Sequence, residues 1–187
     1  MLPVAIPDTR NFKTCAACLW GQASISPANG ILAAHGYHTL AEQYRYQEHE
    51  LYNNNKAEFL VRYLADRRAD ELEILKQLAP HILVCPEKIW LMTVVAKQDL
   101  WWDEKSEAER FYRSGDFANV TSDIAATRGG QAFRYETVFV SLLISNFDDS
   151  LGSRLKKNVA GYDQREQVST LLRLMKSLFD LKVWGDS

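Results

Sequence analysis

Lys97 and Asp99 are the residues whose types and spacing most directly suggest a binding site. They follow an apolar run in the stretch LMTVVAKQDLWW, so a buried strand would end by presenting an ammonium and a carboxylate two residues apart. Ser145 and Asn146 come at the end of a second apolar run, YETVFVSLLIS. In parallel sheets, ligands bind outside the carboxyl ends of the strands. These four residues are therefore the candidate ligand-binding residues.

A metal site is a weaker candidate near the amino terminus. Cys15 and Cys18 have the C-x-x-C spacing of redox and zinc sites, and His35 and His38 could complete a Cys₂His₂ set with unusual spacing. Neither a second C-x-x-C nor an H-x₃₋₅-H follows. The favoured interpretation is a pair of small, buried, reduced thiols, and no metal site is assigned.

Other reactive side chains have simpler interpretations. Trp101 and Trp102 could stack on a ligand or a partner, but such residues more often cover a hydrophobic core. Ser141 is not in a nucleophile-elbow pattern, and Asp148 and Asp149 have no identifiable acid partner. Hydrolase chemistry based on these residues is not favoured, and no catalytic residue is assigned.

Helices and buried strands must alternate to position these residues. Leucines recur at three- and four-residue intervals from Lys56 to Ala79, which predicts an amphipathic helix ending at Pro80. KIWLMTVVA and YETVFVSLLIS read as buried strands, with a helix broken near Gly115 between them. The last segment predicts a helix capped by Asp163. Its apolar stripe comprises Val168, Leu171, Leu172, Met175, Leu178 and Phe179.

This order predicts an α/β fold with three layers, in which helices flank a mostly parallel sheet. The length of 187 residues fits a single domain, residues 1–187. Residues 1–54 have no long periodic pattern and are expected to be rich in loops, whereas residues 56–183 contain the periodic elements.

The stretch TVVAKQDLWW resembles the [N/T]-K-x-D base-recognition element of P-loop GTPases of the TRAFAC type. LLISNF, residues 142–147, stands where such domains place the loop on the other side of the base. Together with AGYDQ, residues 160–164, the combination looks like bacterial GTPase-like domains often found in conflict or defence genes. The resemblance covers about residues 66–183. With the whole of the helix predicted from Lys56, the GTPase-like half of the chain is residues 56–183.

The resemblance implies a role for each candidate residue. Asp99 would accept hydrogen bonds from the N1 and N2 donors of guanine, and the aliphatic stem of Lys97 would lie over the purine plane. Ser145 and Asn146 would belong to the covering loop. Ala96 departs from the pattern, because it stands where these domains have Asn or Thr.

A phosphate-binding loop is missing from the sequence. The G-x-x-x-x-G-K-[S/T] loop cannot be present, since no lysine follows a glycine anywhere in the chain. The D-x-x-G pattern occurs as Asp149–Gly152, after the base element instead of before it. We therefore expect GDP or GTP as a possible ligand, no bound Mg²⁺ and little or no intrinsic hydrolysis.

Composition narrows the partners and the compartment. A formal net charge of −2 does not favour nucleic acid. No apolar window reaches the ~20 residues of a membrane span, and the start lacks the pattern of a secretory signal, so a cytoplasmic location without membrane contact is expected. Two alternatives to the GTPase-like interpretation stay open. The first is a non-catalytic protein-interaction module or regulator on the same fold, which would bind a protein partner. The second is an α/β enzyme of unrelated chemistry.

Overall fold

The computed structural model describes residues 28–40 and 44–185. Three parallel strands form a sheet in the order β1-β2-β3. A two-stranded antiparallel hairpin, β4 and β5, lies apart from it. The strands are β1 (Ala28–Ala33), β2 (Ile89–Val95), β3 (Phe133–Phe139), β4 (Phe147–Asp148) and β5 (Arg154–Lys156); the helices are α2 (Lys56–Val84), α3 (Lys105–Arg113), α4 (Asp116–Arg128) and α5 (Gln164–Gly185), with short 3₁₀ turns η2 (Tyr46–Glu48) and η3 (Trp102–Glu104).

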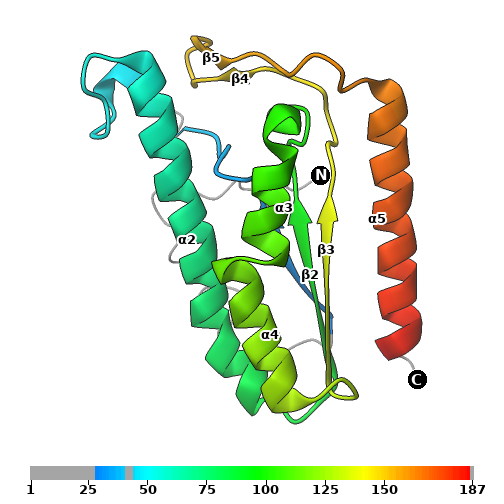
Figure 1. The fold of residues 1–187 in the computed structure, drawn as a ribbon. Helices are drawn as coiled ribbons and strands as arrows, with labels where there is room; N and C mark the ends of the chain where they lie inside the picture. The colour runs from blue at the N-terminus through cyan, green and yellow to red at the C-terminus, as the bar shows by residue number, and fades with distance from the viewer. Residues whose placement is uncertain (1–27, 41–43, 186–187) are drawn as a thin grey trace, which may run out of the picture.

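The predicted α/β class, the parallel pairing and the three layers are confirmed. Figure 1 shows the sheet nearly edge-on, with α2, α3 and α4 on one side and α5 on the other. The larger hydrophobic core lies beneath α2–α4, and a smaller one built around Met92, Val138 and Leu181 lies beneath α5. The strands run toward the hairpin β4–β5, which lies over their carboxyl ends (Figure 1).

Helix α2 was expected to end at Pro80, and that prediction is wrong. The helix continues through Pro80 to Val84. Burial of Ile82, which is fully shielded from solvent, holds the last turn in the core. The guanidinium of Arg128 donates hydrogen bonds to the carbonyl oxygens of Ile82 and Cys85, so carbonyls left open at the helix end are satisfied by α4.

Strand β3 is shorter than predicted. It ends at Phe139, whereas the apolar run predicts a strand through Ser145. After Val140 the chain turns, and Leu142 and Leu143 are exposed. The helices predicted on either side of Gly115 are confirmed as α3 and α4.

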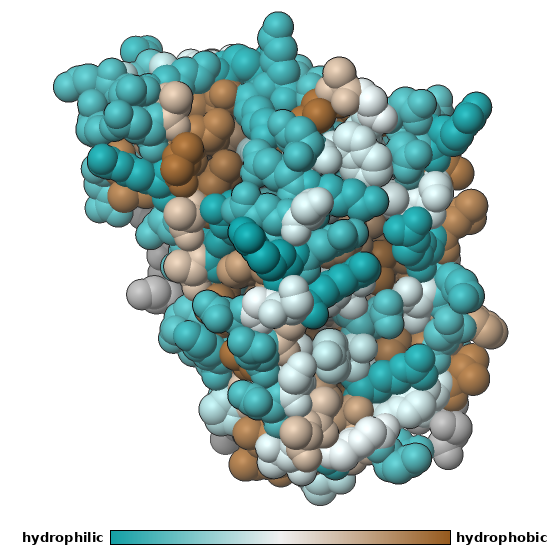
Figure 2. Space-filling model, in the orientation of Figure 1, coloured by the Kyte–Doolittle hydropathy of each residue, from teal (hydrophilic) through white to brown (hydrophobic). Residues whose placement is uncertain are grey.

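The apolar stripe of α5 does not lie against the sheet. Asp163 caps the helix as predicted, because its Oδ1 accepts hydrogen bonds from the amides of Arg165 and Glu166. The helix residues that pack with the sheet residues Met92 and Val138 are Leu174 and Leu181. The predicted stripe instead faces outward for most of its length: Val168, Leu172, Met175 and Phe179 are 48–66% exposed. Figure 2 shows hydrophobic surface along the side of the molecule where α5 lies.

Three strands, β1, β4 and β5, were not predicted. Strand β1 lies inside the region expected to be rich in loops, and it pairs with β2 from Ala28↔Trp90 to Ala33↔Val95. Its sequence, ANGILA, is short and contains the Asn-Gly dipeptide that usually marks a turn. Parallel pairing with the central strand β2 is what makes these residues a strand.

Candidate functional site

The four candidate residues lie near the carboxyl ends of β2 and β3, as predicted, but their side chains do not converge on one open site. Lys97 has a left-handed backbone conformation, with φ of +57°, directly after β2. This uncommon conformation turns the chain sharply, so that Lys97 and Asp99 leave the strand in different directions. We call the cluster of Lys97, Asp99, Ser141 and Ser145 the strand-end corner.

Asp99 is fully buried and its carboxylate is held from two sides. Oδ1 accepts a hydrogen bond of 2.5 Å from the hydroxyl of Ser141, and Oδ2 accepts one of 2.9 Å from the amide of Ser145. The backbone carbonyl of Asp99 also accepts a hydrogen bond of 2.8 Å from the amide of Val159. The carboxylate therefore ties the turn after β2 to the loop after β3.

Lys97 connects the corner to the loop after β1. Its Nζ donates a hydrogen bond of 2.6 Å to the carbonyl oxygen of Tyr37 and lies 5.4 Å from the ring centre of Phe147. Burial lowers the pKa of the Lys97 ammonium, and the nearby Asp99 carboxylate opposes that shift. Lys97 thus joins the ends of the first two strands, while Asp99 joins the ends of the last two.

Asn146 lies outside this cluster. Its Oδ1 accepts a hydrogen bond of 3.2 Å from the amide of Asn158, so it braces the segment after β5 and makes no hydrogen bond to Lys97 or Asp99 in the described part of the chain. Ser145 contributes to the corner through its backbone amide, and its side chain is exposed. The sequence had placed Ser145 and Asn146 together at the site.

Ser141 was missed as a site residue. The sequence offered one signal, since Ser141 interrupts the apolar run of YETVFVSLLIS. The apolar residues on both sides of Ser141 nevertheless make it resemble part of one continuous strand. In the structure the amide of Gln98 donates to the carbonyl oxygen of Val140, which brings the turn after β2 beside Ser141.

Gln98 leaves an acceptor unused in the same turn. It is 2% exposed, and its buried Oε1 has no hydrogen-bond partner in the described structure. A buried acceptor without a donor costs about 1–3 kcal/mol. The turn therefore presents an acceptor that a ligand donor or a water could satisfy.

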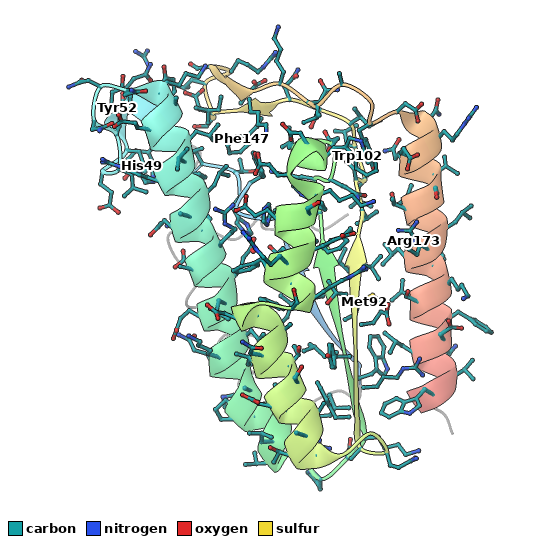
Figure 3. All side chains as sticks on the ribbon, in the orientation of Figure 1. His49, Tyr52, Met92, Trp102, Phe147 and Arg173 are labelled. Carbon is teal, nitrogen blue, oxygen red and sulfur yellow. The ribbon has the colours of Figure 1, made fainter. Side chains whose placement is uncertain are left out.

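Both tryptophans after the corner have structural surroundings. Trp101 is fully buried, and its Nε1 donates a hydrogen bond of 2.9 Å to the carbonyl oxygen of Ala96. Trp102 is partly exposed and packs edge-on against Tyr162. Figure 3 shows Trp102 and Phe147 near the carboxyl end of the sheet. The core role expected for these tryptophans is confirmed for Trp101.

A polar cluster connects strand β5 of the hairpin to the loop after β1 and to η3. Lys156 Nζ contacts Tyr37 Oη and Glu104 Oε1, each at 2.8 Å, and Asp103 Oδ1 at 3.4 Å. Burial of Lys156 would lower the pKa of its ammonium, but Glu104 and Tyr37 outweigh that effect and raise it. Burial raises the pKa of Tyr37 to about 12. Strand β5 is thereby fixed to the loop after β1.

The loop after β1 is clamped by a buried carboxylate. Glu71 Oε1 accepts hydrogen bonds from the amides of Ala34 and Gly36 at 2.9 and 3.2 Å and lies 2.6 Å from His38 Nε2. The hydroxyl of Tyr112 donates to Oε2. Burial alone would raise the pKa of Glu71, but these partners leave it lowered. The clamp positions the loop that receives Lys97.

The candidate metal ligands of the sequence lie only partly within the described residues. The described residues contain no group of three or more His, Cys, Asp and Glu side chains arranged to hold an ion. Cys15 and Cys18 lie outside the described residues, and His38 contacts Glu71. Asp149 accepts backbone hydrogen bonds from Tyr46, Leu151 and Ser153, which gives it a role in the turn of the hairpin.

The chain was compared with known protein families, curated sequences and solved structures. No protein-family model, curated protein sequence or solved structure matches the chain. Among the described residues no helix is long and apolar enough to cross a membrane.

Proposed function

We propose that this chain is a GTPase-like domain that recognises a guanine base at the strand-end corner and has little or no hydrolytic activity of its own. The observation that carries the proposal is the Asp99 carboxylate, held at the end of the central strand by the Ser141 hydroxyl and the Ser145 amide. Each carboxylate oxygen can accept more than one hydrogen bond. Both oxygens thus keep capacity for the paired N1 and N2 donors of guanine.

Access to Asp99 requires the loop after β3 to open, because the carboxylate is fully buried in the closed arrangement. Leu142 and Leu143 in this loop are 64% and 71% exposed, so moving them away from the corner disturbs little packing. They could then flank the purine ring. The bound base would form hydrogen bonds with Asp99 and apolar contacts with the loop, and these would offset the cost of opening.

Hydrolysis is not part of the proposal. The sequence has no glycine-lysine pair to clamp the β and γ phosphates, and phosphoryl transfer depends on such electrostatic stabilisation. Mg²⁺ is not expected to bind for the same reason.

The test measures whether guanine nucleotides raise the melting temperature of the protein, and whether one substitution changes which base does so. GDP and GTP should raise the melting temperature of the purified chain, whereas ATP should not. Asp99→Asn replaces one acceptor by a donor, so it should lose the response to GDP and gain one to xanthosine diphosphate, which has a carbonyl where guanine has its amino group. Asp123→Asn, exposed on α4, is the control and should behave as the parent. The absence of any shift at millimolar GDP would reject guanine recognition.

The second candidate is a protein-interaction module on the same fold. It is favoured by the outward face of α5, where Val168, Leu172, Met175, Phe179 and Val183 are spaced by four, three, four and four residues and are 48–66% exposed. This spacing is typical of a seam between packed helices, so a helix of a partner protein fits it. Leu172→Glu should abolish capture of that partner while Asp99→Asn leaves it intact. A loss of capture in Asp99→Asn alone would count against this candidate.

A further inference from the structure

A pocket separate from the strand-end corner opens between α2, α3 and the start of α4. Its volume is about 340 Å³, and it is lined by His35, Arg68, Glu107, Arg110, Phe111, Ser114, Gly115 and Asp116. None of these residues touches Asp99 or Lys97 through a hydrogen bond or ion pair in the described structure. The pocket therefore needs its own explanation.

His35 is one of the residues that line this pocket, and both of its ring nitrogens are unsatisfied. The residue is fully buried, and neither Nδ1 nor Nε2 has a hydrogen-bond partner in the described structure. Aromatic rings of Trp101, Phe111 and Tyr112 surround the imidazole, with centroid distances of 5.8, 6.3 and 5.8 Å. Burial, followed by the charge of Arg68, lowers the pKa of His35 to about 4, so the ring is neutral at pH 7. A neutral imidazole needs one acceptor and one donor, and a polar ligand can supply them.

Arginines supply positive charge on two sides of the pocket. Arg68 on α2 lies 3.9 Å from Glu107, which is a loose pairing, and its guanidinium is partly buried. Arg110 on α3 is exposed and forms no ion pair with a described residue. Guanidinium groups bind oxyanions in a two-pronged geometry. Both side chains can therefore turn toward a ligand without breaking a strong contact.

The start of α4 adds backbone donors. Gly115 is the N-cap of this 13-residue helix and has no side chain to cap its first amides. A Cβ at Gly115 would lie 2.9 Å from the carbonyl oxygen of Arg110, so glycine allows α3 and α4 to meet closely here. Free amides at a helix start favour a bound anion.

The charges in the pocket limit the ligand to a small anion. Arg68 and Arg110 are opposed by Glu107 and Asp116, so the formal charge of the lining residues is zero with His35 neutral. Asp116 stands in the first turn of α4, where the helix dipole already favours its charge. A highly charged polyphosphate would be repelled by these carboxylates, whereas a single oxyanion group could sit between the arginines and the helix start.

We propose that this pocket binds a small oxyanion of the phosphate type, through Arg68, Arg110, the Ser114 hydroxyl and the first amides of α4, with the ring N–H of His35 as a buried donor. The hydroxyl of Ser114 donates a hydrogen bond of 3.2 Å to the carbonyl oxygen of Arg110 and can be redirected to the ligand. This site does not depend on guanine recognition.

Titration of the full chain with inorganic phosphate, followed by nitrogen-15 NMR at constant ionic strength, tests the proposal. Saturable shifts are expected for the Gly115 and Asp116 amides and for the ring nitrogens of His35. Arg110→Gln should weaken phosphate binding about tenfold. Arg173→Gln on α5, an exposed arginine on the opposite side of the sheet, should leave binding unchanged (Figure 3).

Two further variants test the role of His35 and the independence of this pocket from the strand-end corner. His35→Phe removes the unsatisfied nitrogens without emptying the aromatic cage, and it should fold but bind phosphate several-fold more weakly. Equal binding by His35→Phe would overturn the role of His35. Asp99→Asn should bind phosphate as the parent does, which separates this site from the strand-end corner. Shifts that do not saturate, or that reach half-saturation in Arg110→Gln at the same phosphate concentration as in the parent, would show non-specific anion binding and overturn the proposal.

Discussion

The hydroxyl of Ser141 donates a hydrogen bond of 2.5 Å to Oδ1 of Asp99, and both residues are fully buried. This contact joins the turn after β2 to the loop after β3 by side chains, at a point where the backbone ladder between the strands has ended. The other oxygen of Asp99 is held by the Ser145 amide, so the carboxylate has one fixed orientation. Such an orientation serves stability whether or not a base binds there.

Removing the hydroxyl should destabilise the fold measurably. Ser141→Ala leaves Oδ1 of a buried carboxylate without its donor, which costs about 1–3 kcal/mol of unfolding free energy. Ser122→Ala is the matched control, because Ser122 is exposed and lies 3.5 Å from Tyr135 Oη. Urea denaturation of both variants checks the prediction, and equal midpoints would contradict it.

Gly36 should tolerate no side chain. It has φ of +85°, and a Cβ there would lie 2.4 Å from the carbonyl oxygen of Leu64 on α2. Gly36→Ala should therefore cost roughly 2–4 kcal/mol, through strain and displacement of the loop that receives Lys97. Gly152 has a similar φ of +83° with nothing within 4 Å, so Gly152→Ala isolates the backbone strain and should cost about 1 kcal/mol. Similar losses in the two variants would show that the contact with Leu64 is unimportant.

The periodic elements could be predicted from the sequence because their burial pattern is local. Strand β2 is covered on both faces, and its sequence is a continuous apolar run. The start of α5 is indicated by Asp163, whose side chain caps the helix. Strand β1 could not be predicted, because its residues become a strand through pairing with β2. The predicted end of α2 at Pro80 was wrong for a related reason, because tertiary contacts of Ile82 and Arg128 extend the helix past Pro80.

The candidate site was predicted less completely than the fold. Lys97 and Asp99 were placed at a strand end correctly, since a strand end is visible in the chain itself. The partners of both residues, Tyr37 and Ser141, are 60 and 42 positions away in sequence. Nothing local in the sequence indicates such contacts, and a buried, satisfied carboxylate looks the same in sequence as an exposed one.

The outward side of α5 should accept charge at little cost. Leu172 is 65% exposed, so Leu172→Glu should change the unfolding free energy by less than about 0.5 kcal/mol. Leu181 on the same helix is 1% exposed and packs with Met92 and Val138, so Leu181→Ala should cost about 2–4 kcal/mol. Figure 3 shows Met92 between the sheet and α5. A large loss in Leu172→Glu would mean that this face is covered in solution, and sedimentation analysis of both variants would then identify self-association.

GTP turnover should be absent. Without a glycine-lysine phosphate clamp, the charge that develops on the transferring phosphoryl group has no cation from this chain in the expected position. Phosphate release from GTP, measured with excess Mg²⁺, should equal the rate in a blank without protein. A rate typical of an intact GTPase, and abolished by Asp99→Ala, would contradict this prediction.

Stability should fall as the pH is lowered from about 6.5 to 4, because His35 is buried in its neutral form. The pKa of His35 falls from 6.5 to about 4 on folding, mainly through burial, with Arg68 adding to the effect and Glu71, Glu104 and Glu107 opposing it. Between these two values the unfolded chain binds a proton that the folded chain does not, so unfolding is favoured as pH decreases. The difference corresponds to about 3 kcal/mol.

His35→Phe should flatten this part of the pH profile. The residual slope would come from His49, whose pKa burial also lowers on folding, and at lower pH from Glu71 and Asp149, whose pKa values are lowered in the folded state. Because the pKa of Glu71 is lowered in the folded state, its contribution is present above its unfolded pKa and is lost as the pH falls through the folded value. Urea midpoints measured from pH 7 to pH 4 check both effects. A profile of His35→Phe that is as steep as that of the parent would show that another group controls the acid sensitivity.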